Sequence, residues 1–290
     1  MRFANGWRFV GIAYGLAITG GGALVSGYDA GGLVFILSPL IAAIIVRALG
    51  GDGLRGLGVG LRGPIGWNLL AIFLFPVAMA IAVGTGIATG GVELGPKGTA
   101  DVIAWAALGN LLPRMIFAAC EEFGWRGYLT PALASNNVPR MTNHLIVGLI
   151  WAAWHIPYIL GTPGYSQGSG WLFAPLFLIG VLAMAVILGE TRLRTRSVWP
   201  AVVAHGIANA LAYAFLGDGV FERINTLLYA PRPDSVAMAV ILVVVAIAVA
   251  RVPVPEDDEG GPDRGRLPEC QETPLIIGSS TCPEIFSHSP

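Results

Sequence analysis

Long blocks of apolar residues dominate this 290-residue chain and restrict it to very few folds. Hydrophobic residues make up 54% of the sequence, charged residues make up 12%, and the mean hydropathy is +0.69. A soluble protein of this length would carry more charge. Apolar blocks of about 20 residues match the thickness of a bilayer core, which only helices and closed barrels can cross. The sequence therefore predicts an all-α, polytopic membrane helix bundle.

Eight segments are long enough to cross ~30 Å of hydrocarbon at ~1.5 Å per helical residue. We expect about eight transmembrane helices, at residues 7–27, 31–49, 67–86, 102–129, 144–160, 171–189, 198–216 and 236–252. The fourth segment is too long for one plain span. We expect an interruption near Asn110, Pro113 and Arg114, where proline weakens the helical ladder.

The basic residues favour one orientation of these helices. If the N-terminus is cytoplasmic, twelve of the 17 Lys and Arg residues lie on the cytoplasmic side. Lys97, Arg223 and Arg232 then lie outside, and Arg114 and Arg126 lie within the membrane. The positive-inside rule supports this arrangement. We expect a multi-pass protein of the cell membrane, in contact with lipid, with both termini cytoplasmic; the net charge of −1 predicts no nucleic-acid partner.

The chain divides into four regions by composition. Residues 1–100 hold the N-terminal transmembrane helices, and residues 101–216 form a core that carries the polar motifs. Residues 217–252 hold the last transmembrane helix with its preceding loop. Residues 253–290 are rich in Pro, Gly, Glu and Asp, so we expect a disordered cytoplasmic tail.

Polar residues interrupt three of the apolar segments at similar depth. Glu121 and Glu122 lie ~12–14 Å from the cytoplasmic end of the fourth segment. His155 lies ~18 Å into the fifth, and His205 and Asn209 lie ~12 and ~18 Å into the seventh. Ionisable groups inside a membrane are costly and usually functional. We therefore expect these side chains to meet in one buried site that opens to the cytoplasm.

The spacing gives the two adjacent glutamates different partners. Glu122 and Arg126 are i,i+4 neighbours on one helix face, so they should form an ion pair. Glu121 is turned by about 100° and lacks that partner. A water molecule held between Glu121 and His155 could then give its proton to the carboxylate and attack a carbonyl carbon.

His205 and Asn209, also i,i+4 neighbours, can donate hydrogen bonds to the developing oxyanion. This completes the minimal set for hydrolysis of a peptide bond. A metal mechanism is an equal alternative, because Glu121, His155 and His205 form a ligand set used by catalytic Zn²⁺. No HExxH motif is present, and both mechanisms remain open at this point.

Three motifs in this order resemble those of a known family. They are Glu121-Glu122-x-x-x-Arg126-Gly127, Trp151-x-x-x-His155 and His205-x-x-x-Asn209, within residues 102–216. They look like the motifs of the CPBP intramembrane protease family, which includes the type II CAAX prenyl endopeptidases and bacterial Abi proteins. The resemblance implies an eight-helix endopeptidase, generally classed as a metalloprotease. In that family the first glutamate and the second-motif histidine activate water, and the third motif stabilises the oxyanion.

We therefore expect an intramembrane endopeptidase that acts on a membrane-tethered protein or peptide, or on a CAAX-like C-terminal substrate. Two other functions fit the same residues. A non-catalytic immunity or scaffold membrane protein could keep the fold. A proton-coupled transporter could use intramembrane Glu and His residues as a relay, although they lie toward one face and no inverted repeat is evident.

Several polar and aromatic residues have simpler interpretations. We interpret Arg192, Arg194 and Arg196 as topology anchors. We expect His144 to be solvated at the cytoplasmic interface. Trp151, which stands where the second motif often has Phe, is expected to be a packing or interfacial aromatic.

Overall fold

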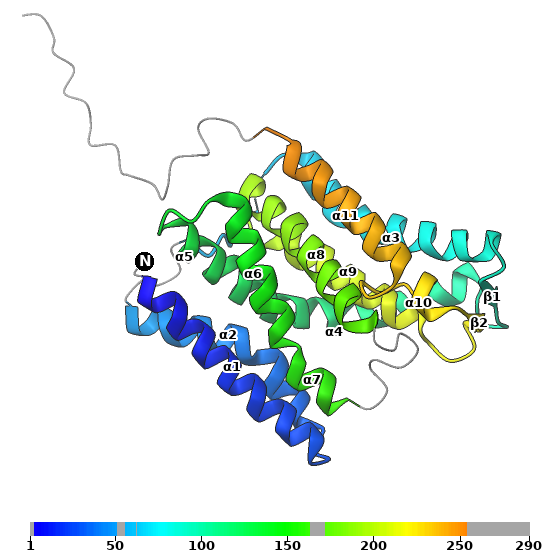
Figure 1. The fold of residues 1–290 in the computed structure, drawn as a ribbon, viewed down its shortest axis with the longest axis horizontal. Helices are drawn as coiled ribbons and strands as arrows, with labels where there is room; N and C mark the ends of the chain where they lie inside the picture. The colour runs from blue at the N-terminus through cyan, green and yellow to red at the C-terminus, as the bar shows by residue number, and fades with distance from the viewer. Residues whose placement is uncertain (1–2, 51–55, 62, 163–171, 254–290) are drawn as a thin grey trace, which may run out of the picture.

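The computed structural model describes residues 3–50, 56–61, 63–162 and 172–253, and Figure 1 shows a bundle of helices with one small sheet in this part of the chain. The longer helices are α1 (Phe3–Val25), α2 (Ala30–Gly50), α3 (Ile65–Ala88), α4 (Ala100–Gly124), α6 (Arg140–Trp154), α8 (Phe173–Thr195), α9 (Trp199–Phe215) and α11 (Val236–Arg251). The shorter ones are α5 (Thr130–Ala134), α7 (Ile156–Gly161) and α10 (Thr226–Tyr229). A helix thus occupies each of the eight predicted segments. The predicted tail lies outside the described residues from position 254 onward.

The predicted all-α, polytopic membrane bundle is confirmed. Within the described residues, six helical stretches are long and apolar enough to cross a membrane. They are Ala4–Val25, Ala30–Gly50, Ile65–Ala88, Ala100–Ala134, Arg140–Gly161 and Phe173–Thr195. Helices α9 and α11 have 17 and 16 residues. At ~1.5 Å per residue they reach ~24–26 Å, slightly less than the ~30 Å of a bilayer core. The number of eight crossings therefore stays a prediction.

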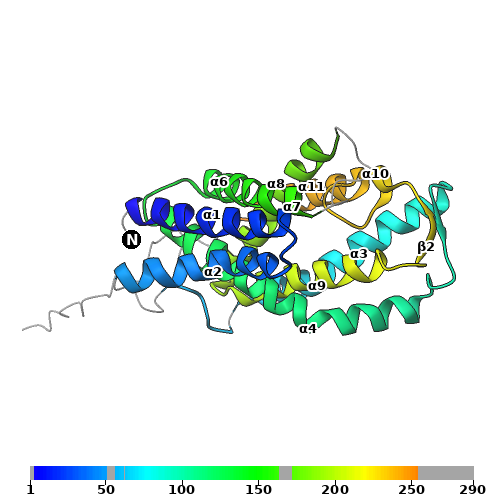
Figure 2. The same ribbon diagram turned by 90° about the horizontal axis from the view of Figure 1, so that it is seen from below.

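Hydrogen bonds at the two ends of the bundle show which connections lie together. At one end, the Val198 N–H donates to the carbonyl of Gly58 at 2.8 Å. At the other, β1 (Val92–Leu94) pairs antiparallel with β2 (Phe221–Ile224), and Figure 2 shows β2 at the end opposite the N-terminus. If successive helices cross the membrane in opposite directions, as predicted, the loops that contain Gly58 and Val198 lie on one side. The two strands then lie on the other side, and the contacts agree with this. Which end faces the cytoplasm stays a prediction.

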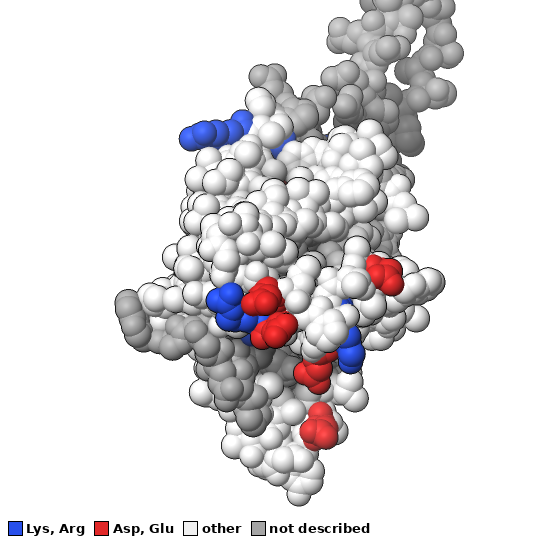
Figure 3. All heavy atoms as spheres, turned by 90° about the vertical axis from the view of Figure 1, so that its right-hand side faces the viewer, with Lys and Arg blue, Asp and Glu red and all other residues white. Residues whose placement is uncertain are grey.

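Charged side chains stand on a mostly uncharged surface at the end that carries the sheet (Figure 3). Exposed charged residues of the segments at this end are Glu93, Lys97, Asp101, Asp218, Glu222 and Arg223. Arg223 Nη2 lies 3.4 Å from Glu93 Oε2, across the two strands. A mixture of both signs suits a hydrated surface outside the hydrocarbon, so this end is where the helices leave the membrane.

Helices α1 and α2 pack closely enough for their backbones to touch. An ideal Cβ atom on Gly20 would lie 2.6 Å from the carbonyl oxygen of Gly31 and 2.7 Å from the backbone nitrogen of Phe35. Small residues permit such close approach, which is a main source of helix association in lipid. Gly11, earlier on α1, faces open space instead.

The predicted interruption near Pro113 is wrong. Helix α4 continues through Asn110, Pro113 and Arg114 and ends at Gly124. Helices at membrane depth tolerate proline because local adjustments and neighbouring groups satisfy the freed backbone atoms. The irregularity comes later, in the π-helical turn η1 (Trp125–Leu129).

The π-helical turn directly follows the two glutamates. The Thr130 N–H donates to the carbonyl of Trp125, five residues earlier. The carbonyl of Arg126 is thereby released and accepts a hydrogen bond from Arg192 Nε at 3.2 Å. Pro131, which follows, has no N–H with which to continue the α-helical ladder. Arg192, predicted to be a topology anchor, thus also supports the backbone beside the predicted site.

Replacing Gly20 with alanine should destabilise the protein by about 1–3 kcal/mol, because the new methyl group would overlap backbone atoms of α2. Gly11→Ala is the matched control on the same helix. There the methyl group meets nothing, and alanine should be neutral or stabilising by up to about 1 kcal/mol. Thermal unfolding of the detergent-purified variants measures the difference. Equal unfolding midpoints for the two variants would contradict the packing described here.

Candidate functional site

Glu122 lies at the centre of a fully buried ion pair. Its Oε1 is 2.8 Å from Arg126 Nη1, one helical turn away, and both side chains are 0% exposed. His205 Nδ1, from α9, lies 2.9 Å from the same oxygen. If Glu122 is ionised it only accepts, so His205 carries a proton on Nδ1. The predicted i,i+4 pair is confirmed, and the imidazole joins α9 to it.

Glu121 faces a different set of groups, as the helical geometry predicts. Trp151 Nε1–H donates to Glu121 Oε2 at 2.8 Å. The other oxygen, Oε1, lies 4.0 Å from His205 Nε2, which is beyond hydrogen-bond length. Glu121 is only 4% exposed. The carboxylate is therefore held on one oxygen by a neutral donor while the second oxygen remains able to accept.

Trp151 connects the three sequence motifs. The Arg126 guanidinium carbon lies 4.4 Å from the centroid of its ring, and the His205 ring lies 5.4 Å from it, edge to face. Its backbone carbonyl accepts a hydrogen bond from His155 Nδ1 at 2.8 Å. The prediction that Trp151 is a packing or interfacial aromatic does not include its bond to Glu121. The tryptophan itself could have indicated this bond in the sequence, because its indole has an N–H donor that phenylalanine lacks.

His155 lies at a break between α6 and α7, where the sequence predicted one continuous helix. Pro157 stands in the first turn of α7 and cannot donate to the carbonyl four residues earlier, so α6 ends at Trp154. The His155 ring is partly exposed and lies 4.9 Å from the Trp154 ring and 5.3 Å from the Phe177 ring. Because Nδ1 donates to the Trp151 carbonyl, Nε2 is the nitrogen with a free lone pair.

Asn209 lies one helical turn beyond His205 on the same face of α9. Its side chain is partly exposed, unlike that of His205, which is buried. The structure thus brings Glu121, Glu122, Arg126 and His205 into direct proximity. His155 joins them through Trp151, and Asn209 extends the row along α9.

The predicted zinc ligands Glu121, His155 and His205 do not form a three-ligand cluster as they lie in the structure. Among the described residues, no group of three or more His, Cys, Asp and Glu side chains is arranged to hold a metal ion. Glu121 and His205 approach each other at 4.0 Å, whereas His155 is bound through Nδ1 to a backbone carbonyl. Zn²⁺ binding stays a prediction, and no chemical step below depends on it.

A second buried polar cluster surrounds Glu190 on α8. Its Oε1 lies 3.1 Å from His144 Nε2 and 3.2 Å from Arg140 Nε, and its Oε2 lies 3.0 Å from Arg194 Nη2. The prediction that His144 is solvated is wrong, since this residue is only 3% exposed. Gly189 makes room for it, because a Cβ atom there would overlap the imidazole. With both carboxylate oxygens bound by cations or imidazole, the cluster stabilises the packing of α6 on α8.

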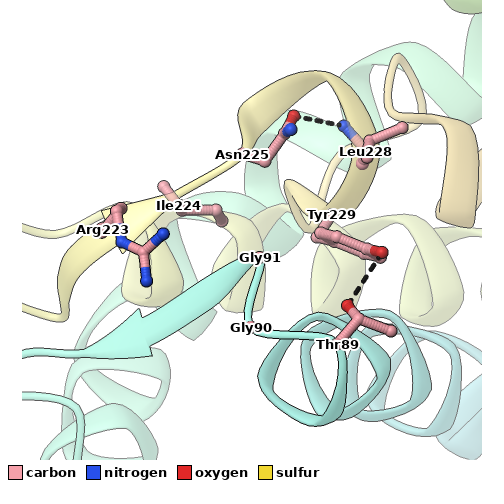
Figure 4. A pocket seen from close by; sticks show the side chains of 8 residues that line it. All are labelled: Thr89, Gly90, Gly91, Arg223, Ile224, Asn225, Leu228 and Tyr229. Atoms are coloured by element: carbon pink, nitrogen blue, oxygen red, sulfur yellow. Dashed lines mark hydrogen bonds between the residues drawn. The ribbon is translucent and has the colours of Figure 1, made fainter.

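A hollow of about 480 Å³ opens at the sheet end of the bundle, between α3, β2 and α10 (Figure 4). The hydroxyls of Thr89 and Tyr229 are hydrogen-bonded at 2.9 Å, and Asn225 accepts from the Leu228 N–H at 3.1 Å. These polar groups already have hydrogen-bond partners within the protein. None of the predicted site residues is among the residues that line this hollow.

The segment that carries these motifs is similar to known proteins. Residues 103–211 match the family described as type II CAAX prenyl endopeptidase Rce1-like. CAAX prenyl protease 2 of Methanococcus maripaludis is 29% identical over 100 residues, which are 33% of this chain and 36% of that protein. The chain therefore aligns with about a third of the length of that relative.

The matched segment begins within α4 and ends within α9. It includes all the residues predicted for the site, which are Glu121, Glu122, Arg126, His155, His205 and Asn209. The resemblance read from three short motifs thus agrees with a match over 103–211. This segment of the chain is thus similar to the CAAX proteases of the CPBP family.

Proposed function

We propose that this protein is an intramembrane endopeptidase that hydrolyses a peptide bond of a membrane-associated protein, with CAAX-like C-terminal peptides as the first substrate class to examine. One observation carries the proposal. Glu121 is buried, its Oε2 is held by Trp151, and its Oε1 remains free to take a proton. The arginine that could have neutralised it is bound to Glu122 instead. A buried carboxylate of this kind suits general-base chemistry.

The proposed reaction needs only groups of this chain and a water molecule. Glu121 takes a proton from water while the water oxygen attacks the carbonyl carbon of the substrate. His155 Nε2 accepts the second hydrogen of the same water and orients it. The carbon–nitrogen bond then breaks as Glu121 returns its proton to the leaving nitrogen. The products are a carboxylic acid and an amine.

The developing oxyanion needs donors on the opposite side of the carbonyl. In its doubly protonated form, His205 donates Nδ1–H to Glu122 and keeps Nε2–H for the oxyanion. Asn209 supplies an amide N–H from the next turn of α9. Glu122 and Arg126 are positioning residues, because they hold the imidazole without reaching the substrate.

A non-catalytic immunity or scaffold protein would not need this arrangement. Buried ionisable groups are weak contributors to stability, and apolar residues of similar size often pack as well or better. A scaffold would therefore gain little from a buried glutamate whose second oxygen lies 4.0 Å from the His205 ring, beyond hydrogen-bond length. The matched family, too, is one of endopeptidases.

Glu121→Gln should lower kcat by about 10²–10⁴-fold, because the amide keeps the shape of the side chain and cannot accept a proton from water. The measurement is cleavage of a membrane-tethered CAAX peptide by purified protein in proteoliposomes. Glu93→Gln, on exposed β1, is the control and should retain full activity. Undiminished cleavage by Glu121→Gln would exclude this glutamate as the base, and a cellular phenotype that survives the loss of cleavage would support the scaffold function.

Trp151→Phe should lower kcat by about 10–100-fold while the ring packing is kept, because one hydrogen bond to a charged group is lost. Trp199→Phe is the matched control, since it removes an indole N–H bond of 2.9 Å that goes to the carbonyl of Val59 and not to a glutamate. Rates of the two variants are compared after equal yields of folded protein are verified. Equal rates would show that the indole donor does not position Glu121.

Dialysis against a strong chelator should leave the cleavage rate within about twofold, because the proposed steps use no metal. A zinc peptidase treated in parallel provides the positive control for metal removal. Loss of activity that Zn²⁺ restores, together with about one equivalent of bound zinc, would replace this mechanism with the metal alternative.

A further inference from the structure

Helix α2 contacts the backbone break at His155 from both sides, although it lies outside the matched segment 103–211. The Phe35 ring stacks on the ring of Trp154, the last residue of α6, with the two centroids 3.9 Å apart. It also stacks on the ring of Tyr158 in α7, at 5.0 Å. One ring of α2, only 2% exposed, therefore spans the junction between the two helices.

Ser38, one helical turn after Phe35, holds the same tryptophan. Trp154 Nε1–H donates to Ser38 Oγ at 2.9 Å, and the Ser38 hydroxyl donates in turn to the carbonyl of Phe35 at 2.7 Å. Ser38 and Trp154 are both 0% exposed. Because solvent does not reach these atoms, the indole N–H would lose its hydrogen bond if the hydroxyl were removed. The serine therefore fixes the orientation of the indole.

The Trp154 ring in turn bounds the imidazole of His155. The two rings meet edge to face with their centroids 4.9 Å apart, and the Phe177 ring lies 5.3 Å from the imidazole. The bond from His155 Nδ1 to the Trp151 carbonyl holds one atom of the imidazole, and the flanking rings restrict its plane. A shift of the Trp154 ring therefore changes the direction of the His155 Nε2 lone pair.

The same turn of α2 also touches the helix that carries the glutamates. An ideal Cβ atom on Gly124 would lie 2.5 Å from Pro39 Cβ and 2.9 Å from the Pro39 carbonyl oxygen. Gly124 follows Glu121 by three residues, or about 4.5 Å along the axis of α4. Helix α2 thus packs against α4 beside Glu121 and against the break beside His155, so its position affects the distance between these two groups.

We propose that Ser38 and Phe35 are positioning residues that hold His155, through the Trp154 ring, where it can share a water molecule with Glu121. This inference rests on the endopeptidase function proposed above. Both residues act through another side chain and belong to a helix outside the matched segment. Their loss should slow the chemical step without weakening the binding of the peptide, which is a fall in kcat at constant KM.

The first test removes the hydroxyl group. Ser38→Ala should lower kcat about 10-fold on a membrane-tethered peptide in proteoliposomes and leave KM within about twofold, because a small misplacement of a catalytic group is costly. Tyr14→Phe is the matched control, since it removes a hydrogen bond of 2.7 Å from α1 to the carbonyl of Ile150 in α6. It should keep the wild-type kcat. If kcat of Ser38→Ala is no lower than that of Tyr14→Phe, the contact only packs the helices and the inference is refuted.

A double-mutant cycle tests whether Ser38 acts through the indole. Trp154→Phe keeps an aromatic ring beside Phe35 and His155 and removes the N–H, so its kcat should fall by a similar factor. In this background Ser38→Ala should cause no further loss, because the bond is already absent. Factors that multiply in the double variant would mean that the two residues act independently, and would overturn the inference.

Phe35→Leu is a second variant that keeps the proposal testable if Ser38→Ala does not fold. It removes the stacked ring and retains apolar bulk, so kcat should again fall about 10-fold at constant KM. Phe75→Leu is its control, because Phe75 of α3 is also buried, at 1% exposed. Thermal unfolding verifies that both variants lose similar stability. Equal kcat values for the two variants would refute the role of Phe35.

The measurements separate the two proposals. Absence of cleavage by the wild-type protein would refute the endopeptidase function, and this inference with it. Cleavage by the wild-type protein that continues at the full rate in Ser38→Ala and Phe35→Leu would leave the function standing and refute the positioning role alone.

Discussion

The buried ion pair between Glu122 and Arg126 is the interaction on which the proposed site depends. Both side chains are 0% exposed, so neither charge can be stabilised by bulk water. Removing one partner would leave the other as an uncompensated charge in a low-dielectric interior. The same carboxylate holds His205 and so joins α4 to α9. By engaging the arginine, Glu122 leaves its neighbour Glu121 without a hydrogen-bonded cation, since His205 Nε2 stays 4.0 Å away, and the chemistry we propose requires this difference.

Irregular backbone surrounds the proposed site on two sides, and proline accounts for much of it. Pro157 ends α6 and leaves His155 at the junction with α7. Pro131 follows the π-helical turn that comes after the two glutamates. Each irregularity frees backbone groups that must find other partners at membrane depth. The bond from Arg192 to the carbonyl of Arg126 is one such solution, and it ties the turn to α8.

Three arginines in or beside the predicted spans illustrate how partners decide the role of a charge. Arg126 is paired with a carboxylate, Arg192 donates to backbone carbonyls, and Arg114 lies over the rings of Tyr213 and Phe117. In the sequence all three are single cations in or beside apolar segments. Their different partners appear only when neighbouring helices are in place.

The sequence by itself determined the helical segments, the membrane character and the pairing of Glu122 with Arg126. Span length and i,i+4 spacing are properties of one helix, so they can be read along the chain. Depth along the spans also brought Glu121, His155 and His205 to similar levels. Only the tertiary structure decided that Trp151 donates to Glu121, that His155 turns to a backbone carbonyl and that His144 is buried against Glu190. These contacts depend on the rotation of each helix about its axis and on the local backbone breaks. Packing between helices sets both, and the linear sequence does not record it.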